Sequence, residues 1–319
     1  MSAKTTTSET STSARWLEFI ERAEATLKRA ELLLPENPPP IHWSKTLAAR
    51  WERRRSVRHG GSGALYPVAT PHTVSLDRLV GIDEQIARID QNTKQFVAGY
   101  PANNVLLTGA PGTGKSSLVK AMLSRYGKRG LRLIEVDKSD LFDLPKILDS
   151  LQGAAQRFIL FCDDLAFDVQ EGGYRELKAV LDGSITAPPE NVLIYATSNR
   201  RHLMPTFFHE NFSSNDGKSE IHPDEAKEEK TALAERFGLW ISFYPFGEDD
   251  YLAAVAGWLN HHQIALPKTA AASEALRLEA LQWARMRGSV SGRTAWQFAR
   301  HYAGQKALAG QKTLAGQKS

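Results

Sequence analysis

The stretch GAPGTGKS, residues 109–116, decides the fold class because it matches the pattern G-x-x-x-x-G-K-[ST] of a phosphate-binding loop. An apolar stretch, NVLLTG (104–109), precedes it, and a helical pattern from Ser116 to Tyr126 follows it. Glycines let successive backbone N–H groups turn inward around an anion at a helix N-terminus. The stretch therefore predicts a nucleotide site, and a glycine-rich structural turn is the alternative.

The residue types in this loop suit the phosphates of a nucleotide. Lys115, the only cation of the loop, would reach the β- and γ-phosphates, and the Ser116 hydroxyl would coordinate Mg²⁺. We expect the phosphates to contact the loop and the first helical turn, namely Gly109, Ala110, Pro111, Gly112, Thr113, Gly114, Lys115, Ser116 and Ser117.

Apolar strands alternate with helical patterns between residues 104 and 246. This alternation indicates a parallel sheet that is covered on both faces. The predicted fold class is therefore α/β, a P-loop NTPase core with a five-stranded parallel sheet followed by a small α-helical domain. The predicted strands are 104–109, 131–137, 157–164, 191–199 and 239–246, and the later helices are 248–263, 270–287 and 291–303.

Shifts in composition divide the chain into five regions: a variable tail and helix (1–40), a basic linker (41–78), the α/β core (79–246), a helical lid (247–303) and a low-complexity tail (304–319). In the basic linker, residues 42–59 carry six Lys and Arg residues interleaved with Trp43 and Trp51. This segment is either a solvated linker helix or a surface that contacts nucleic acid. The AGQK repeats of the tail indicate a fraying helix extension or a flexible end.

Two adjacent carboxylates, Asp163 and Asp164, follow the apolar stretch FILFC (158–162). A second parallel strand that ends in Asp would place these carboxylates at the same sheet edge as the phosphate loop. We expect Asp163 to join Ser116 in the Mg²⁺ shell and Asp164 to polarise the attacking water, with two solvated acids as the alternative. Because Asp is one methylene shorter than Glu, either this strand end lies closer to the γ-phosphate or turnover is slow.

Three further polar residues are candidates for the same site. Asn199 ends the predicted strand 191–199 and would orient the attacking water. Arg236 lies at a helix-to-strand junction, either as a surface arginine or as an arginine finger that reaches a neighbouring subunit's γ-phosphate. Arg293 begins the last helix, where it would meet the phosphates or simply face solvent. The run Arg200–His202 and the acidic segment 210–229 are weaker candidates for contacts with a partner.

These motifs, in this order, resemble the AAA+ ATPases: LVGID (79–83) on the adenine side, Walker A (109–116), Walker B (158–164), sensor 1 (Asn199), the arginine-finger box (Arg236) and sensor 2 (Arg293). The stretches RFILFCDDLAF, YATSNRRHL and ERFGLW are similar to a mainly bacterial branch catalogued as domain of unknown function 815. Pro111 departs from that branch, where we expect Arg, and Asp164 departs from the common AAA+ Asp-Glu ending. The Asp-Asp ending resembles replication initiators and helicase loaders.

The resemblance implies an ATP hydrolase with ATP and Mg²⁺ as ligands, a helical lid and a ring or partial ring of identical subunits. We expect it to remodel or load an unidentified protein or nucleic-acid client; the alternative is a slow nucleotide switch or loader scaffold on nucleic acid. The sequence lacks a membrane-spanning apolar run, and its single cysteine, Cys162, fits a cytoplasmic, reducing setting. The net charge of +4 alone is too small to indicate nucleic acid.

Overall fold

The computed structural model describes residues 16, 19–29, 40–53, 63–165, 173–183, 189–199 and 233–316, with backbone alone for Tyr174 and 309–316. The predictions for Arg200–His202 and for 210–229 lie outside these residues. The chain divides into two compact units, 1–40 with 53–64 and 41–52 with 65–319. In the first unit, residues 19–29 are helical, within the helix expected before residue 40.

The second unit is built on a sheet with the strand order β2-β1-β4-β5-β6-β3-β7. β1 pairs with β4, β4 with β5, β5 with β6, β6 with β3 and β3 with β7, each in parallel. The strands are β1 (Ala48–Arg53), β2 (Gly63–Pro67), β3 (Val105–Gly109), β4 (Leu131–Glu135), β5 (Arg157–Cys162), β6 (Val192–Ser198) and β7 (Leu239–Phe243). The predicted parallel α/β architecture is confirmed.

The predicted number of five strands is wrong, because the sheet has seven. The two missed strands, β1 and β2, lie at one edge and are short. β1 reads AARWER, and because Arg50 and Arg53 are exposed and Glu52 is half-buried, it lacks the continuous apolar run of a fully buried strand. Part of the predicted basic linker therefore belongs to the sheet.

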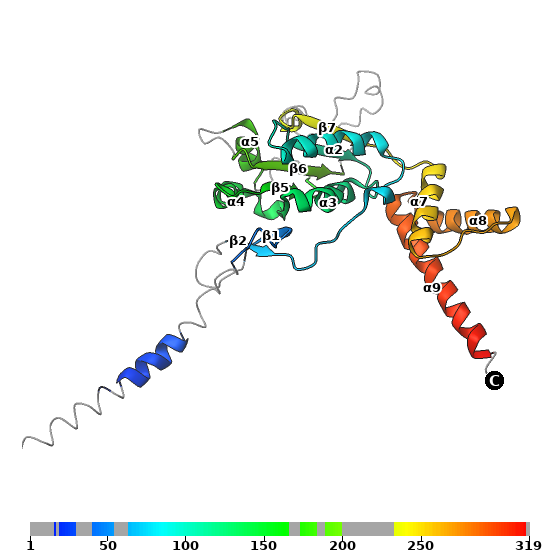
Figure 1. Ribbon diagram of the computed structural model, residues 1–319, viewed down its shortest axis with the longest axis horizontal. Helices are drawn as coiled ribbons and strands as arrows, with labels where there is room; N and C mark the ends of the chain where they lie inside the picture. Colours follow the sequence, from blue (N-terminus) through cyan, green and yellow to red (C-terminus); the bar gives the residue numbers. More distant parts are fainter. Residues whose placement is uncertain are drawn as a thin grey trace, which may run out of the picture. The chain divides into compact units, whose positions relative to one another are not determined.

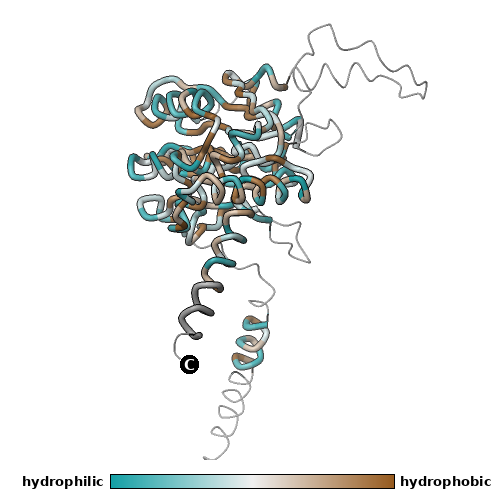
Figure 2. Tube along the Cα trace, turned by 90° about the vertical axis from the view of Figure 1, so that its right-hand side faces the viewer, coloured by the Kyte–Doolittle hydropathy of each residue, from teal (hydrophilic) through white to brown (hydrophobic). Residues whose placement is uncertain are grey.

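Helices cover both faces of the sheet (Figure 1). On β5, Phe158, Leu160 and Cys162 pack with the helices α4 (Leu144–Leu151) and α5 (Tyr174–Asp182). The alternate residues Ile159 and Phe161 pack with α2 (Asp83–Val97) and α3 (Lys115–Tyr126). Successive strand residues point to opposite faces, so this burial explains why the strand is apolar throughout. Hydrophobic stretches of the trace lie mainly in the interior of the core (Figure 2). Short 3₁₀ turns accompany these helices: η1 (Leu76–Arg78), η2 (Gly127–Arg129) and η3 (Lys138–Asp143).

Three helices after β7 form a separate bundle: α7 (Glu248–His261), α8 (Ala270–Met286) and α9 (Gly292–Gly316). They enclose an apolar cluster of their own, which contains the fully buried Tyr251 and Phe298. The bundle lies to one side of the sheet (Figure 1). α9 continues through the residues expected to form a low-complexity tail, so the helix extension is observed as far as Gly316. No helix among the described residues has the length and apolarity needed to cross a membrane.

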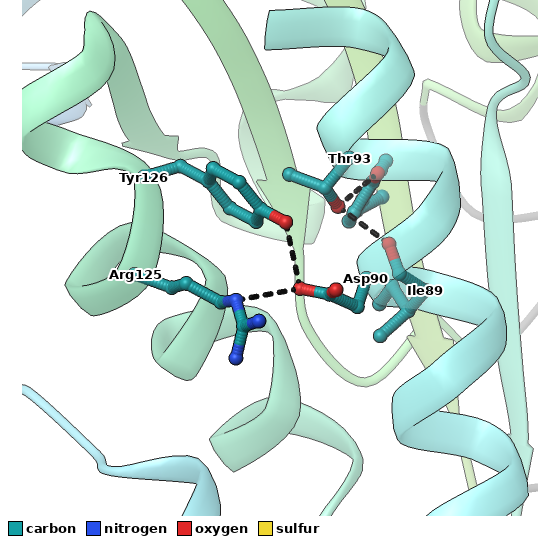
Figure 3. A network of polar contacts seen from close by, with 6 residues as sticks. Ile89, Asp90, Thr93, Arg125 and Tyr126 are labelled. Atoms are coloured by element: carbon teal, nitrogen blue, oxygen red, sulfur yellow. Dashed lines mark hydrogen bonds and ion pairs between the residues drawn. The ribbon is translucent and has the colours of Figure 1, made fainter.

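A network of polar contacts joins α2 to α3 and β6 (Figure 3). Asp90 of α2 accepts a hydrogen bond from the Tyr126 hydroxyl at 2.8 Å and pairs with Arg125 Nε at 3.0 Å. Thr93 of α2 lies 2.8 Å from the hydroxyl of Tyr195 in β6, and burial raises the pKa of Tyr195 to about 12. The network fixes α2, and with it the segment before α2, against the helix that follows the phosphate loop.

The two tryptophans of the basic segment belong to the core. Trp51 is only 5% exposed, and its indole Nε1 donates to Asp143 Oδ2 at 3.2 Å. The Trp43 ring packs edge-on against Phe158 with centroids 4.9 Å apart. These rings are therefore placed to pack in the core and not to stack on bases, which removes the aromatic part of the argument for nucleic-acid contact by residues 42–59. The contact of the basic side chains with nucleic acid stays a prediction, and residues 54–59 lie outside the described part of the chain.

Replacing Trp51 should destabilise the second unit. Trp51→Ala should cost about 3–5 kcal/mol of unfolding free energy, the usual range for deleting a buried aromatic side chain. Urea unfolding followed by far-UV circular dichroism measures this cost. The matched control is Trp16→Ala, because Trp16 is 62% exposed and its removal should change the stability little. Equal stability of the two variants would contradict the placement of β1 in the core.

Candidate functional site

The carboxyl ends of β3, β6 and β5 meet at one edge of the sheet, with β6 between the other two. The phosphate loop leaves β3 at Gly109, where an added Cβ would lie 2.0 Å from the Phe243 carbonyl oxygen. Gly112 and Gly114 have backbone φ values of +78° and +101°, which residues with a side chain rarely adopt. The loop therefore requires glycine at these positions both for its backbone conformation and for its close approach to β7.

Lys115 is buried at the start of α3, and its ammonium group makes three hydrogen bonds. Nζ donates to the carbonyl oxygens of Gly109 and Ala110, each at 2.8 Å, and to Asn199 Oδ1 at 2.9 Å. Burial lowers the pKa of Lys115 to about 8, against the opposing attraction of Asp163 and Asp164. A lysine has three donors, so each is used within the chain.

Ser116 and Asp163 form a second contact beside this lysine. Ser116 Oγ donates to Asp163 Oδ1 at 2.7 Å, and the Thr197 hydroxyl of β6 donates to the same oxygen at 2.5 Å. The predicted pair of Mg²⁺ ligands is thus brought together. Thr197 was not predicted as a site residue, although its place in the polar end of β6 was a usable signal.

Asp164 is held in an unusual backbone conformation. Its φ is 57°, in the left-handed region that Asp tolerates better than most residues. Its N–H donates to Thr197 Oγ1 at 2.9 Å, and its Oδ1 accepts from Asn199 Nδ2 at 2.6 Å. Asn199 therefore bridges Lys115 and Asp164, one through each end of its amide.

A cavity of about 560 Å³ opens above this sheet edge and is lined by the phosphate loop, Asp163, Asp164, Thr197 and Asn199. Its other walls come from the segment before α2 and from the helical bundle. Arg78 lies over the Trp258 ring at 5.7 Å from its centroid. The apolar and aromatic lining is provided by Val74, Leu79, Val80, Ile82, Phe246, Ala254, Trp258 and Trp296, of which only the segment 79–83 had been singled out.

Arg293 lines the same cavity from the N-terminus of α9. An added Cβ on Gly112 would lie 2.9 Å from Ser291 Oγ and 3.5 Å from the Arg293 Cβ, so the phosphate loop and the start of α9 are in close contact. Arg293 thus lies beside the phosphate loop, and its contact with a phosphate stays a prediction.

Arg236 is not among the residues that line the cavity. Its Nε forms an ion pair with Asp182 at the end of α5. The structure therefore does not bring Arg236 to the nucleotide cavity of its own chain, and the sequence did not single out Asp182.

The donors at this site suit Mg²⁺. Ser116 and Asp163 offer hard oxygen ligands, and Mg²⁺ is usually bound by one or two carboxylates together with substrate phosphates. Among the described residues, no group of three or more His, Cys, Asp or Glu side chains is placed to hold a metal. Cys162, directly before Asp163, is fully buried, and burial raises the pKa of its thiol to about 12, so the thiol stays protonated.

Comparison with known proteins relates the chain to AAA+ ATPases. It is 32% identical over 123 residues to a 26S proteasome regulatory subunit 4 homolog of Schizosaccharomyces pombe, covering 33% of this chain and 28% of that protein. It is 27% identical over 166 residues to the ATP-dependent zinc metalloprotease FtsH of Rhodothermus marinus, covering 43% and 23%. The chain thus matches less than a third of the length of these two relatives.

A solved structure shows the same fold. The ORC1 protein of Aeropyrum pernix, solved in complex with DNA, has a TM-score of 0.51 and 14% identity, with 73% of this chain and 62% of that chain covered. A variant of Thermotoga maritima RuvB has a TM-score of 0.48 and 15% identity, with 71% and 64% covered.

The family match covers most of the chain. Residues 44–306 match the family described as "Protein of unknown function (DUF815)". Together with the AAA+ relatives, this match shows that the chain belongs to the DUF815 family within the AAA+ ATPase superfamily.

Proposed function

We propose that this protein binds and hydrolyses Mg-ATP at the boundaries between identical subunits and uses the reaction to remodel or load a macromolecular client. The observation that carries this proposal is the hydrogen-bonded series Lys115–Asn199–Asp164, which faces one cavity together with Ser116 and Asp163. It brings a phosphate-binding cation and a carboxylate within reach of one ligand. A cytoplasmic location remains part of the proposal.

Lys115 must exchange partners when the phosphates enter. Its three donors are used by two backbone carbonyls and by Asn199, so a γ-phosphate oxygen has to replace at least one of them. The phosphate is the better acceptor because it carries negative charge, whereas the carbonyl and amide oxygens that now accept from Lys115 are neutral. Replacement of Asn199 would free its amide oxygen to accept a hydrogen bond from water.

Asp164 would then act on that water. Its carboxylate already accepts from Asn199 Nδ2, so the amide and the carboxylate can hold one water between them. Asp164 would accept the proton as the water oxygen attacks the γ-phosphorus and the bond from this phosphorus to the β–γ bridging oxygen breaks, which releases ADP and phosphate. Ser116 and Asp163 would hold Mg²⁺, which, when bound, would neutralise negative charge on the phosphates.

The helical bundle and Arg236 account for the proposed assembly. α7–α9 would be a lid, because Arg293 and Trp258 line the cavity and would lie over the phosphate and base ends of a bound nucleotide. Arg236 would reach the γ-phosphate of a neighbouring subunit, since it does not line its own cavity. To do so, it would exchange the Asp182 carboxylate for phosphate oxygens.

Lys115→Ala should weaken ATP binding about a hundredfold or more, because two charge-assisted hydrogen bonds to phosphate would be lost. Isothermal titration calorimetry measures the affinity. Lys94→Ala on the exposed side of α2 is the control and should bind ATP normally. Unchanged affinity in Lys115→Ala would refute the nucleotide site.

Asp164→Asn should bind ATP within about threefold of the native affinity and should lower kcat by about 10²–10⁴, the usual contribution of a general base. Asp164→Glu should also be slower, because the left-handed backbone already carries the shorter carboxylate to Asn199. Steady-state phosphate release measures both rates. A faster Glu variant would show that the native Asp164 carboxylate lies too far from the attacking water, and it would favour the slow nucleotide switch.

Arg236→Ala should leave ATP binding intact and should lower hydrolysis about 10³-fold, as expected for an arginine finger. Mixing it with Asp164→Asn should restore part of the activity, because a mixed boundary combines an intact Asp164 with an intact Arg236. Arg175→Ala, an exposed arginine on the same helix as Asp182, is the control and should hydrolyse ATP normally. Normal turnover by monomeric Arg236→Ala would exclude the finger.

A further inference from the structure

The net positive charge of the chain comes from its last 40 residues, 280–319. The full sequence carries 40 Lys and Arg and 36 Asp and Glu; seven of these basic residues and none of the acidic ones lie from Ala280 onward. The first 279 residues therefore have 33 basic and 36 acidic residues, a formal net charge of −3. The net charge of +4 arises wholly from residues 280–319.

The described cations of this region are on the surface. We define the α8–α9 basic surface as the cations Arg285, Arg287, Arg300 and Lys306 together with the neighbouring His301, all of which are exposed. Among the described residues, none of them forms an ion pair with a carboxylate. By contrast, Arg277 earlier in α8 pairs with Glu248 and Glu274.

The acids of the helical bundle lie away from these cations along the sequence. They are confined to the first turn of α7 and to the first three turns of α8, at Glu248, Asp249, Asp250, Glu274 and Glu279. Asp250 accepts from the Gly247 N–H, which occupies it as a helix cap. Within the part of the bundle whose side chains are described, no ion pair joins these acids to the cations at the C-terminal end of α8 or in α9.

Aromatic rings hold several of these cations in place. The Arg287 guanidinium lies 4.6 Å from the Trp283 ring centroid, and His301 stacks with the same ring at 4.8 Å. Arg300 lies 4.7 Å from the Trp296 centroid, and Lys306 lies 5.3 Å from the Tyr302 centroid. A guanidinium that lies against a ring keeps its N–H edge directed outward and loses less side-chain entropy when it binds an anion.

We propose that the α8–α9 basic surface binds the phosphate backbone of nucleic acid. The cations are several, exposed and spread along two helices, which suits a polymer of evenly spaced negative charges better than a single small anion. Arg287 and His301 already lie against the Trp283 ring, so this ring is occupied and we do not expect bases to stack on it. The contact is therefore with phosphates and is independent of base sequence.

The inference goes beyond the proposed ATPase activity and assigns a partner class to a surface outside the nucleotide cavity. Arg285, Arg287, Arg300, His301 and Lys306 are not among the residues that line the cavity. Charge reversal at Arg287 and Lys306 therefore leaves Lys115, Asp163 and Asp164 in place, and the two proposals can fail separately.

Fluorescence anisotropy with labelled duplex DNA, single-stranded DNA and single-stranded RNA tests the proposal. The full-length protein without nucleotide is titrated over a range of salt concentrations, alongside Lys115→Ala, which should bind nucleic acid as the native protein does. Arg287→Glu/Lys306→Glu should weaken binding at least about tenfold and reduce the salt slope by about two phosphate contacts, roughly 0.9 each on duplex DNA. The three probes show which nucleic acid is preferred.

The matched control reverses two exposed cations of the α/β core. Lys128→Glu/Arg129→Glu makes the same change in net charge and also removes a cation over a ring, because Arg129 lies 5.4 Å from the Tyr126 centroid. It should bind nucleic acid within about twofold of the native protein if binding is local to α8–α9. Circular dichroism confirms that both variants are folded.

Three results would overturn the proposal. The first is no binding of any probe at low salt, and the second is an equal loss in the core control. The third is binding to phosphatidylserine vesicles but not to oligonucleotides, which would show that the surface serves a lipid headgroup instead.

Discussion

The site depends on the side-chain amide of Asn199. This amide lies between the buried ammonium group of Lys115 and the carboxylate of Asp164, and it hydrogen-bonds to both. β6 lies between β3 and β5, so its end is the one place from which a short side chain reaches both. The amide oxygen accepts from Lys115, and the amide nitrogen donates to Asp164. Direct pairing of the two charges would leave each with less to offer a substrate. With the amide between them, phosphate can take the lysine while the carboxylate keeps its place.

The position of β6 is itself fixed from within the core. Tyr195 lies two residues before Thr197 on this strand, and its hydroxyl contacts Thr93 and Asn92 of α2. Asp90 of the same helix accepts hydrogen bonds from α3, which begins at Lys115. These contacts of α2 thus hold two elements in place: β6, which leads to Asn199, and α3, which begins at Lys115. α2 itself follows the segment 79–83. Such buried networks, when satisfied, specify a single arrangement of their elements.

The sequence was most informative where the chemistry demands fixed spacing. A phosphate loop needs Gly109, Gly112, Gly114 and Lys115 at set intervals, and a buried parallel strand needs an unbroken apolar run, so both were predictable. β1 was not, because its exposed Arg50 and Arg53 interrupt the apolar pattern, so that Trp51 within it and Trp43 before it looked like surface aromatics. The left-handed turn at Asp164 and the pairing of Arg236 with Asp182 were also beyond reach, since each depends on contacts between distant segments.

α9 connects the two surfaces to which functions are assigned. Its first turn contacts the phosphate loop at Gly112, and Arg300 lies seven residues after Arg293, about 10 Å farther along a helix that rises 1.5 Å per residue. Arg300 also lies against Trp296, which lines the nucleotide cavity. A nucleotide that shifts the start of α9 must therefore shift the cations along it. If ATP changes the affinity of this surface for nucleic acid by some factor, nucleic acid must change the affinity for ATP by the same factor, because the coupling free energy belongs to both ligands.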